Sequence, residues 1–338
     1  MQMHAKAFVI KQCGYYQRGE KDVPQYGGAD ELADLIGDWT IEELPIQETK
    51  TYESGEYGEL LPVYFMGVHS IPRTDEFLLR LWNQTDVAGD QFGSVIGHST
   101  VNAPDVRESE VPTGGIPGFP SYYWFFPSLE KVIGLRFNTR THGHPGLNMF
   151  LKNFLSHFSH HVVESEDGEV LGYAKDDEEE PSHMYPRFHT APMRLPGVVD
   201  QIRRHRPGIY KLLHRKELLI DRRPDRAMLT KVLEFIGMNQ PELPAEDAGF
   251  QFEVDYKPTN VALEEILDKY QSGDYSEWDD IGFKVTGLQS PIWLGARQKT
   301  VTLETDVQPG EGGLVELPQL VNRLSRLRTR LLRDLGIH

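Results

Sequence analysis

Apolar positions switch between strand-like and helix-like spacing along the chain, without a regular strand–helix–strand repeat. Strands are predicted where β-branched and aromatic residues cluster, at 5–10, 61–68, 76–83, 122–126, 132–137, 250–256 and 281–285. Helices are predicted where apolar residues recur at intervals of three and four, at 29–39, 145–158, 198–206, 225–238, 260–270 and 317–335. This order favours an α+β fold, with a mixed or antiparallel sheet, packed helices and two lobes.

The strongest hairpin signal is a pair of runs at 122–126 and 132–137, joined by a short turn. Alternation along the first run places its aromatic side chains on both faces of the strand: Tyr123 and Phe125 on one, and Tyr122, Trp124 and Phe126 on the other. An exposed face could stack nucleic-acid bases. A strand that is apolar on both faces is more often buried, so we expect a core strand.

Several segments have no single predicted structure. A strand is expected at 162–163 or at 170–173, the type of 209–220 is open, and 292–305 fits a bent strand or a hairpin. The Gly- and Pro-rich stretch 88–120 suggests a long excursion. We therefore predict an N-terminal α+β lobe at 1–112, and a second lobe at 113–338 with the hairpin, the basic region and the last helix.

Composition indicates a globular protein with 39% hydrophobic and 25% charged residues among 338. No apolar run approaches the roughly 18 residues of a membrane helix, and the first residues lack the pattern of a signal peptide. The single cysteine, Cys13, cannot form an internal disulfide. We therefore expect a cytoplasmic protein that is not inserted into a membrane. Phosphate-loop, dinucleotide and nucleophile-elbow motifs are missing, so no cofactor is expected.

Charge is distributed unevenly. The formal net charge is −16, yet residues 194–231 hold eleven basic and four acidic side chains. Such a basic stretch suits phosphate binding, and pairing with the protein's own acidic surface, such as 176–180, is the alternative. The candidate phosphate contacts are Arg203, Arg204, Arg206, Lys211, Arg215, Lys216, Arg222, Arg223 and Arg226.

The predicted helix at 317–335 has two stripes. One is basic, with Arg323, Arg326, Arg330 and Arg333, and adds to the positive charge available for a polyanion. The other is apolar, with Leu320, Leu324, Leu327 and Leu331. The leucine stripe could form a dimer interface or pack within one subunit.

Two further patterns are compatible with metal chemistry. Five histidines lie close together, at His142, His144, His157, His160 and His161. On a helix, His157 and His161 would share one face, as metal ligands do, although a surface histidine face is the more common explanation. Asp255 and Lys257, with Asp247 upstream, have the form of a metal-dependent nuclease site, a short motif that also arises by chance.

One block of sequence supports a family resemblance. Gly118-Phe119-Pro120-Ser121, the aromatic strand, Val132-Ile133-Gly134-Leu135-Arg136 and a helix that begins Gly146-Leu147-Asn148 resemble the RexA-type phage exclusion proteins. The resemblance implies a two-domain, dimeric, non-enzymatic DNA-binding protein of prophage or antiphage defence. It carries no catalytic residues to this chain.

Three hypotheses follow. The first is sequence-independent binding of the DNA backbone by the basic stretch, with the protein as a homodimer in phage exclusion. The second is a metal-dependent nuclease. The third is an acidic protein-interaction module that engages a basic partner in a defence system or mimics DNA.

Overall fold

The computed structural model describes residues 1–20, 22–40, 44–53, 60–85, 93–108, 111–137, 143–176, 180–193, 198–218, 248–272, 279–294, 300–308, 310 and 314–337. The predicted α+β class is confirmed, and every strand pair between described residues is antiparallel. The predicted helix at 225–238 lies outside these residues.

A large sheet forms the main body of the protein (residues 1–193 and 300–337). Its central path has the order β10-β1-β7-β6-β3-β2, β15 also pairs with β1, and β4 joins β5 to β6. The strands are β1 (Gln2–Tyr16), β2 (Val63–Ser70), β3 (Phe77–Gln84), β4 (Gly93–Ile96), β5 (Val106–Glu108), β6 (Gly115–Phe126), β7 (Lys131–Phe137), β10 (Tyr185–Pro192) and β15 (Thr300–Glu304).

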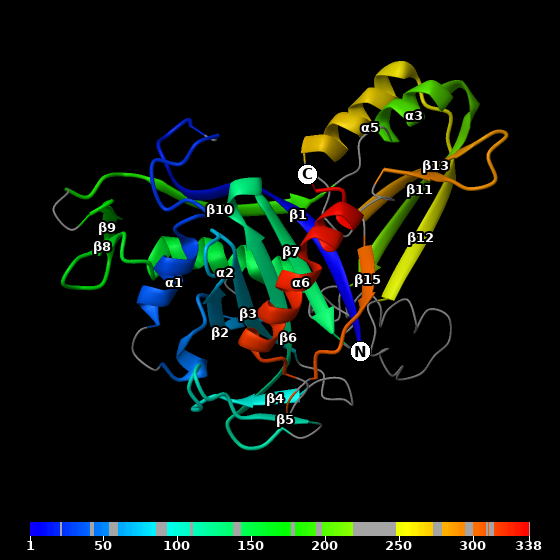
Figure 1. The fold of residues 1–338 in the computed structure, drawn as a ribbon. Coiled ribbons are helices and arrows are strands. Elements are labelled where there is room, and N and C mark those ends of the chain that lie inside the picture. Colours follow the sequence, from blue (N-terminus) through cyan, green and yellow to red (C-terminus); the bar gives the residue numbers. More distant parts are fainter. Residues whose placement is uncertain are drawn as a thin grey trace.

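Helices cover both faces of this sheet (Figure 1). α1 (Leu32–Trp39) and α2 (His144–His157) contribute to the hydrophobic cluster on one face, and α6 (Leu317–Leu335) to the cluster on the other. The aromatic strand β6 joins the two clusters as its alternation predicts. Tyr123 and Phe125 face α1 and α2, whereas Tyr122, Trp124 and Phe126 face α6. All five are buried, so they offer no stacking surface for bases.

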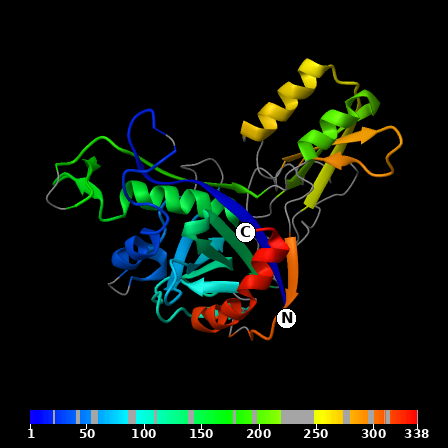
Figure 2. The ribbon, with the colours of Figure 1, turned by 45° about the horizontal axis from the view of Figure 1, so that its top comes forward.

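A second unit, residues 198–294, has its own sheet and core (Figure 2). Its sheet has the order β12-β11-β13-β14. Its elements are α3 (Val198–His205), β11 (Ile209–Leu218), β12 (Ala248–Asp255), α5 (Asn260–Ser272), β13 (Asp279–Val285) and β14 (Ile292–Trp293). Every member of the third hydrophobic cluster lies within this unit, including Ile202, Leu263 and Phe283.

A small hairpin stands apart from both sheets. It consists of β8 (Val162–Glu164) and β9 (Val170–Tyr173), so the two alternatives for this region both form strands and pair with each other. Short 3₁₀ helices complete the described structure at Ile46–Glu48, Pro127–Leu129 and Arg206–Gly208.

Three expectations need correction. The boundary at residues 112 and 113 falls inside the main sheet, because β3 and β4 precede it and pair with β6 after it. The segment 292–305 is not one hairpin, since β14 pairs with β13 and β15 pairs with β1. β10 was missed because Pro186 and Pro192 weaken a strand signal. Both prolines are compatible with its position at an end of the central path.

Candidate nucleic-acid interface

The first predicted phosphate contact, Arg203, is paired within the second unit. Its Nη2 lies 2.8 Å from Oε2 of Glu264 on α5, and its Nε donates to Oε1 of the same carboxylate at 3.0 Å. The charge-assisted hydrogen bond raises the pKa of Arg203 and lowers the pKa of Glu264. Asp200, one turn back on α3, lies 3.5 Å from Nη1 of Arg203. Two carboxylates therefore surround this guanidinium.

Lys211 is paired in the same way, across the sheet of the second unit. Its Nζ lies 3.4 Å from Oε2 of Glu253 and 3.6 Å from Oδ1 of Asp255, both on the neighbouring strand β12. Lys284 on β13 reaches the same Glu253 at 2.6 Å. The hydrogen bond to Glu253 raises the pKa of Lys211, and the hydrogen bond from Lys284 lowers the pKa of Glu253.

Among the side chains that the structure describes in the second unit, six are basic and six are acidic. For Arg203 and Lys211, the alternative of internal pairing is confirmed. Their partners among the described residues are carboxylates of the same unit. Arg204 and Arg206 form no ion pair with another described residue. The side chains of Arg215 and Lys216, and all of Arg222, Arg223 and Arg226, lie outside the described structure.

The leucine stripe of α6 faces the core of its own subunit. Leu320, Leu324 and Leu331 are 0% exposed, and Leu327 packs against the same cluster. The prediction that these four leucines form a dimer interface is therefore wrong. On the face of the sheet opposite α1 and α2, the side chains of β1, β6 and β7 are apolar. Helix α6 packs against them and removes them from solvent.

Polar contacts fix the start and the middle of α6. Arg80, buried on β3, donates to the carbonyl of Val315 at 3.3 Å, and the Tyr122 hydroxyl accepts from Val315 N at 2.8 Å. Further along, Arg328 Nη2 lies 2.6 Å from Oε1 of Glu76, a carboxylate that is 3% exposed. The helix is thus held with one side against the sheet.

The remaining arginines of α6 form what we call the arginine face: Arg323, Arg326, Arg330 and Arg333. Arg326, Arg330 and Arg333 are exposed, and Arg323 pairs at 2.9 Å with Asp306. Asp334, the single acidic residue on α6, forms ion pairs with Arg330 at 3.5 Å and with Arg333 at 3.3 Å, so one carboxylate is shared between two exposed guanidinium groups. The face spans about 15 Å at a rise of about 1.5 Å per residue. Together with Arg328, these four arginines give α6 five basic residues, in a protein whose net charge is −16.

The histidines do not form a metal site among the described residues. α2 ends at His157, so no helix contains both His157 and His161 and the condition for a shared helix face is not met. His157 and His160 are exposed, whereas His161 is buried with its Nδ1 3.0 Å from the carbonyl of Ala174. His144 is also buried and bonds to Thr190 at 2.7 Å; His142 lies outside the described residues.

The nuclease pattern has no metal-binding geometry in the described structure. Asp255 is a partner of Lys211, its side chain is 88% exposed, and Lys257 is exposed as well. Asp247 lies outside the described residues. No three His, Cys, Asp or Glu residues of the described part of the chain are grouped to hold a metal.

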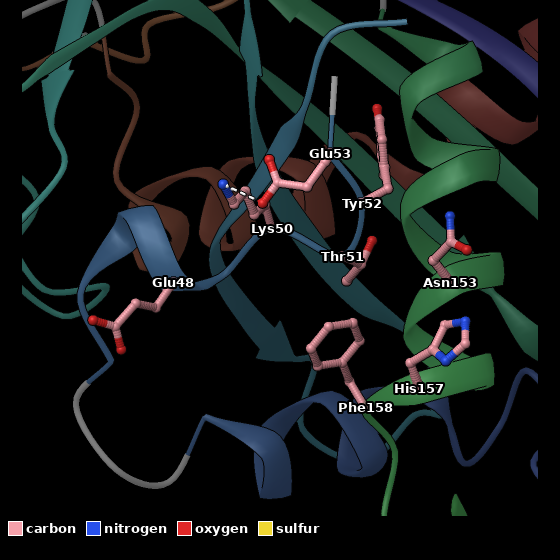
Figure 3. Close-up of a pocket in the computed structure, with 8 residues that line it drawn as sticks. All are labelled: Glu48, Lys50, Thr51, Tyr52, Glu53, Asn153, His157 and Phe158. Atoms are coloured by element: carbon pink, nitrogen blue, oxygen red, sulfur yellow. Dashed lines mark ion pairs between the residues drawn. The ribbon is translucent and has the colours of Figure 1, made fainter. Parts of the chain in front are cut away.

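A cleft of about 390 Å³ opens beside the C-terminal end of α2 (Figure 3). Its lining residues are Glu48, Lys50, Thr51, Tyr52, Glu53, Asn153, His157 and Phe158. Lys50 and Glu53 pair at 2.6 Å, Thr51 donates to Phe150 O, and Asn153 donates to Met149 O. The volume suits a small molecule.

No protein-family description, curated protein or solved structure matches this chain. Among the described helices, none has both the length and the apolar character needed to cross a bilayer. The arginine face of α6 is thus the candidate interface that emerges from the geometry. The sequence contained its signal, a basic stripe opposite an apolar one.

Proposed function

We propose that this protein binds DNA without sequence specificity through the arginine face of α6. The observation that carries the proposal is the exposure of Arg326, Arg330 and Arg333 on a helix whose opposite side is fixed to the core. Guanidinium groups bind phosphate oxygens in a planar, two-pronged geometry. A stripe of them along one helix suits a linear array of phosphates.

The acidic remainder of the protein limits how DNA can approach. With a net charge of −16, most of the surface repels a polyanion, whereas the arginine face attracts one. Arginines that contact phosphates position a protein on DNA, whereas base edges carry the sequence information. We therefore expect binding that weakens steeply with salt and varies little with sequence.

The test is a salt-series binding titration of double-stranded DNA to the full chain. Each lost phosphate contact lowers the slope of log affinity against log salt by about 0.9, so the triple variant Arg326→Gln, Arg330→Gln, Arg333→Gln should lose about 2.7. At low salt we expect its affinity to fall at least about tenfold, which corresponds to about 1.4 kcal/mol.

The matched control removes the same number of charges from the second unit, in the variant Arg203→Gln, Arg204→Gln, Arg206→Gln. If the arginine face is the interface, this variant retains most of its affinity. If the control loses more affinity than the α6 variant, the basic stretch is the interface and the proposal is wrong. A salt-independent affinity would also overturn it.

The wider role in phage exclusion, the homodimer and the cytoplasmic location remain predictions from the sequence resemblance and composition. They extend the proposed DNA binding to a setting in antiphage defence. A plaque assay with the α6 triple variant in a host that expresses the protein would test that setting, because loss of DNA binding should restore phage growth.

A further inference from the structure

The hairpin β8–β9 carries a second concentration of charge, opposite in sign to that of α6. We call residues 162–176 the acidic arm. It holds five acidic residues and one basic residue, whereas α6 holds five basic residues and one acidic residue. The acidic residues of the arm are Glu164, Glu166, Asp167, Glu169 and Asp176, and all are exposed.

The arm is built on a buried base. The backbone N–H of Ala174 donates to the carbonyl of His161 at 3.0 Å, and the His161 ring bonds back to Ala174. The Tyr173 hydroxyl donates to Ser156 O at 3.3 Å, and its ring centre lies 5.2 Å from that of Tyr15 in the core. The base of the hairpin is therefore attached to the core of the main body, and the exposed acidic residues extend from that attachment.

The tip of the arm has features of a contact surface. Its turn is closed by hydrogen bonds between Ser165 and Glu169. Beside the turn, Leu171 is 54% exposed and Val170 is 36% exposed. The exposed carboxylates of the arm form no ion pair with another described residue. An apolar centre with a charged rim is the usual arrangement of a protein interface.

The acidic arm and the arginine face cannot meet within one chain. Tyr173 at the base of the arm packs against the cluster that contains α1 and α2, whereas α6 belongs to the cluster on the other face of the sheet. Figures 1 and 2 both place β8 and β9 far from α6. Complementary surfaces that face away from each other can meet between two copies of the chain.

We propose that the acidic arm of one copy docks on the arginine face of α6 in a second copy. The contact is head-to-tail, so a pair of copies keeps one free helix, on the copy that gives its arm, and one free arm, on the copy that gives its helix, and association can continue into a ring or a chain. The arm would then occupy the same arginines that we propose for DNA. The inference shares this face with the proposed function, and its test uses no nucleic acid, so that the two can fail separately.

The test is sedimentation velocity of the full chain at low and high salt, with two charge-reversal variants. One reverses the arm, with Glu166→Lys, Asp167→Lys and Glu169→Lys. The other reverses the helix, with Arg326→Glu, Arg330→Glu and Arg333→Glu. All six positions are exposed, and circular dichroism would verify that both variants are folded.

The wild type should associate at low salt and dissociate at high salt, because salt screens the contact. Each variant alone should be monomeric, since its arm and helix then have the same sign of charge. An equal mixture of the two variants should associate again, because every arm now meets a helix of opposite charge.

Two outcomes would overturn the inference. A wild type that stays monomeric at low salt would leave the arm to a foreign basic partner instead of a second copy. A wild type that associates, without recovery in the mixture of variants, would place the contact elsewhere on the surface. Leu171→Ser should weaken the wild-type association without changing its salt dependence, because it removes the apolar centre alone.

Discussion

The main body and the second unit both contain many arginines and lysines, but they place them differently. In the second unit, opposite charges lie on adjacent elements and neutralise each other, as Arg203 and Glu264 do. In the main body, α6 buries its leucines and leaves three of its five arginines, Arg326, Arg330 and Arg333, exposed, with Asp334 as the one carboxylate of the helix beside them. The difference teaches that a basic stretch of sequence is not a basic surface. The surface charge depends on which distant segment the fold brings alongside.

The largest expected effect is the loss of stability when a buried phenylalanine is removed from the core of one unit or of the other. Phe125 is fully buried and stacks on Phe77 with ring centres 4.5 Å apart, while Phe283 is fully buried in the second unit. Phe125→Ala and Phe283→Ala should each cost about 3–5 kcal/mol in the unit concerned. Calorimetry should show Phe125→Ala lowering the transition of the main body and Phe283→Ala lowering that of the second unit. A single transition shifted equally by both would mean that the cores unfold together.

The next effect concerns the ion pair below α6. Glu76 is buried, its Oε1 contacts Arg328, and its Oε2 has no hydrogen-bond partner. Arg328→Met should therefore destabilise the main body by about 1–3 kcal/mol, because a buried carboxylate loses its cation. Urea unfolding measures this change, with the exposed Arg330→Met as the control. Equal midpoints for the two variants would contradict the proposed importance of burial.

A smaller effect is expected from pH at the base of the arm. Burial lowers the pKa of His161, and the neighbouring His160 lowers it further. His161 Nδ1 is the atom beside Ala174 O, and Nε2, which would take the added proton, is buried without an acceptor. The unfolded histidine, with a pKa of about 6.5, therefore binds the proton first as the pH falls.

The contribution of His161 to stability is consequently complete above about pH 6.5 and declines as the pH falls towards its lower folded pKa. Urea midpoints measured across this range should show the decline. His161→Asn, which can still donate to Ala174, should flatten it, and His157→Asn serves as the control for loss of a histidine. If the urea midpoint of His161→Asn still declined with pH as steeply as that of the wild type, the pH dependence would arise from another group.

The smallest effect is expected in the second unit. Replacement of Arg203 and Glu264 together by glutamine removes an exposed ion pair without changing the net charge. Exposed pairs contribute little to stability, so the urea midpoint of the second unit should stay within error of the wild type. A marked decrease in the urea midpoint would show that this exposed pair stabilises its unit as much as we expect Glu76 and Arg328 to stabilise the main body.

Local pattern was sufficient to predict much of the main sheet. The alternation in β6 predicted which aromatic residues face α1 and α2 and which face α6, because period-two spacing fixes the face of each side chain. The bounds of α2 were predicted to within one residue, 145–158 against His144–His157, because its apolar positions recur at helical spacing. The domain division failed because long-range strand pairing, which sequence spacing does not encode, crosses residue 112.

The candidate site was predictable only in part. The arginine stripe of α6 follows from helical periodicity and was recognised in the sequence. The neutralisation of Arg203 and Lys211 could not be foreseen, because their partners Glu264 and Glu253 lie 61 and 42 residues further along the chain. Only the folded contact between these segments decides which cations remain available.

The pairing of β1 has a consequence for how the protein can be taken apart. β10 leaves the main sheet with Pro192 opposite Phe8, and β15 enters it with Thr300 opposite Lys6. These two positions on β1 are about 7 Å apart, at about 3.4 Å per residue. The chain therefore departs for the second unit and comes back at almost the same point. In engineering terms the second unit is a cassette, which a short linker could replace, or a different domain could occupy, while the sheet and α6 keep their connections.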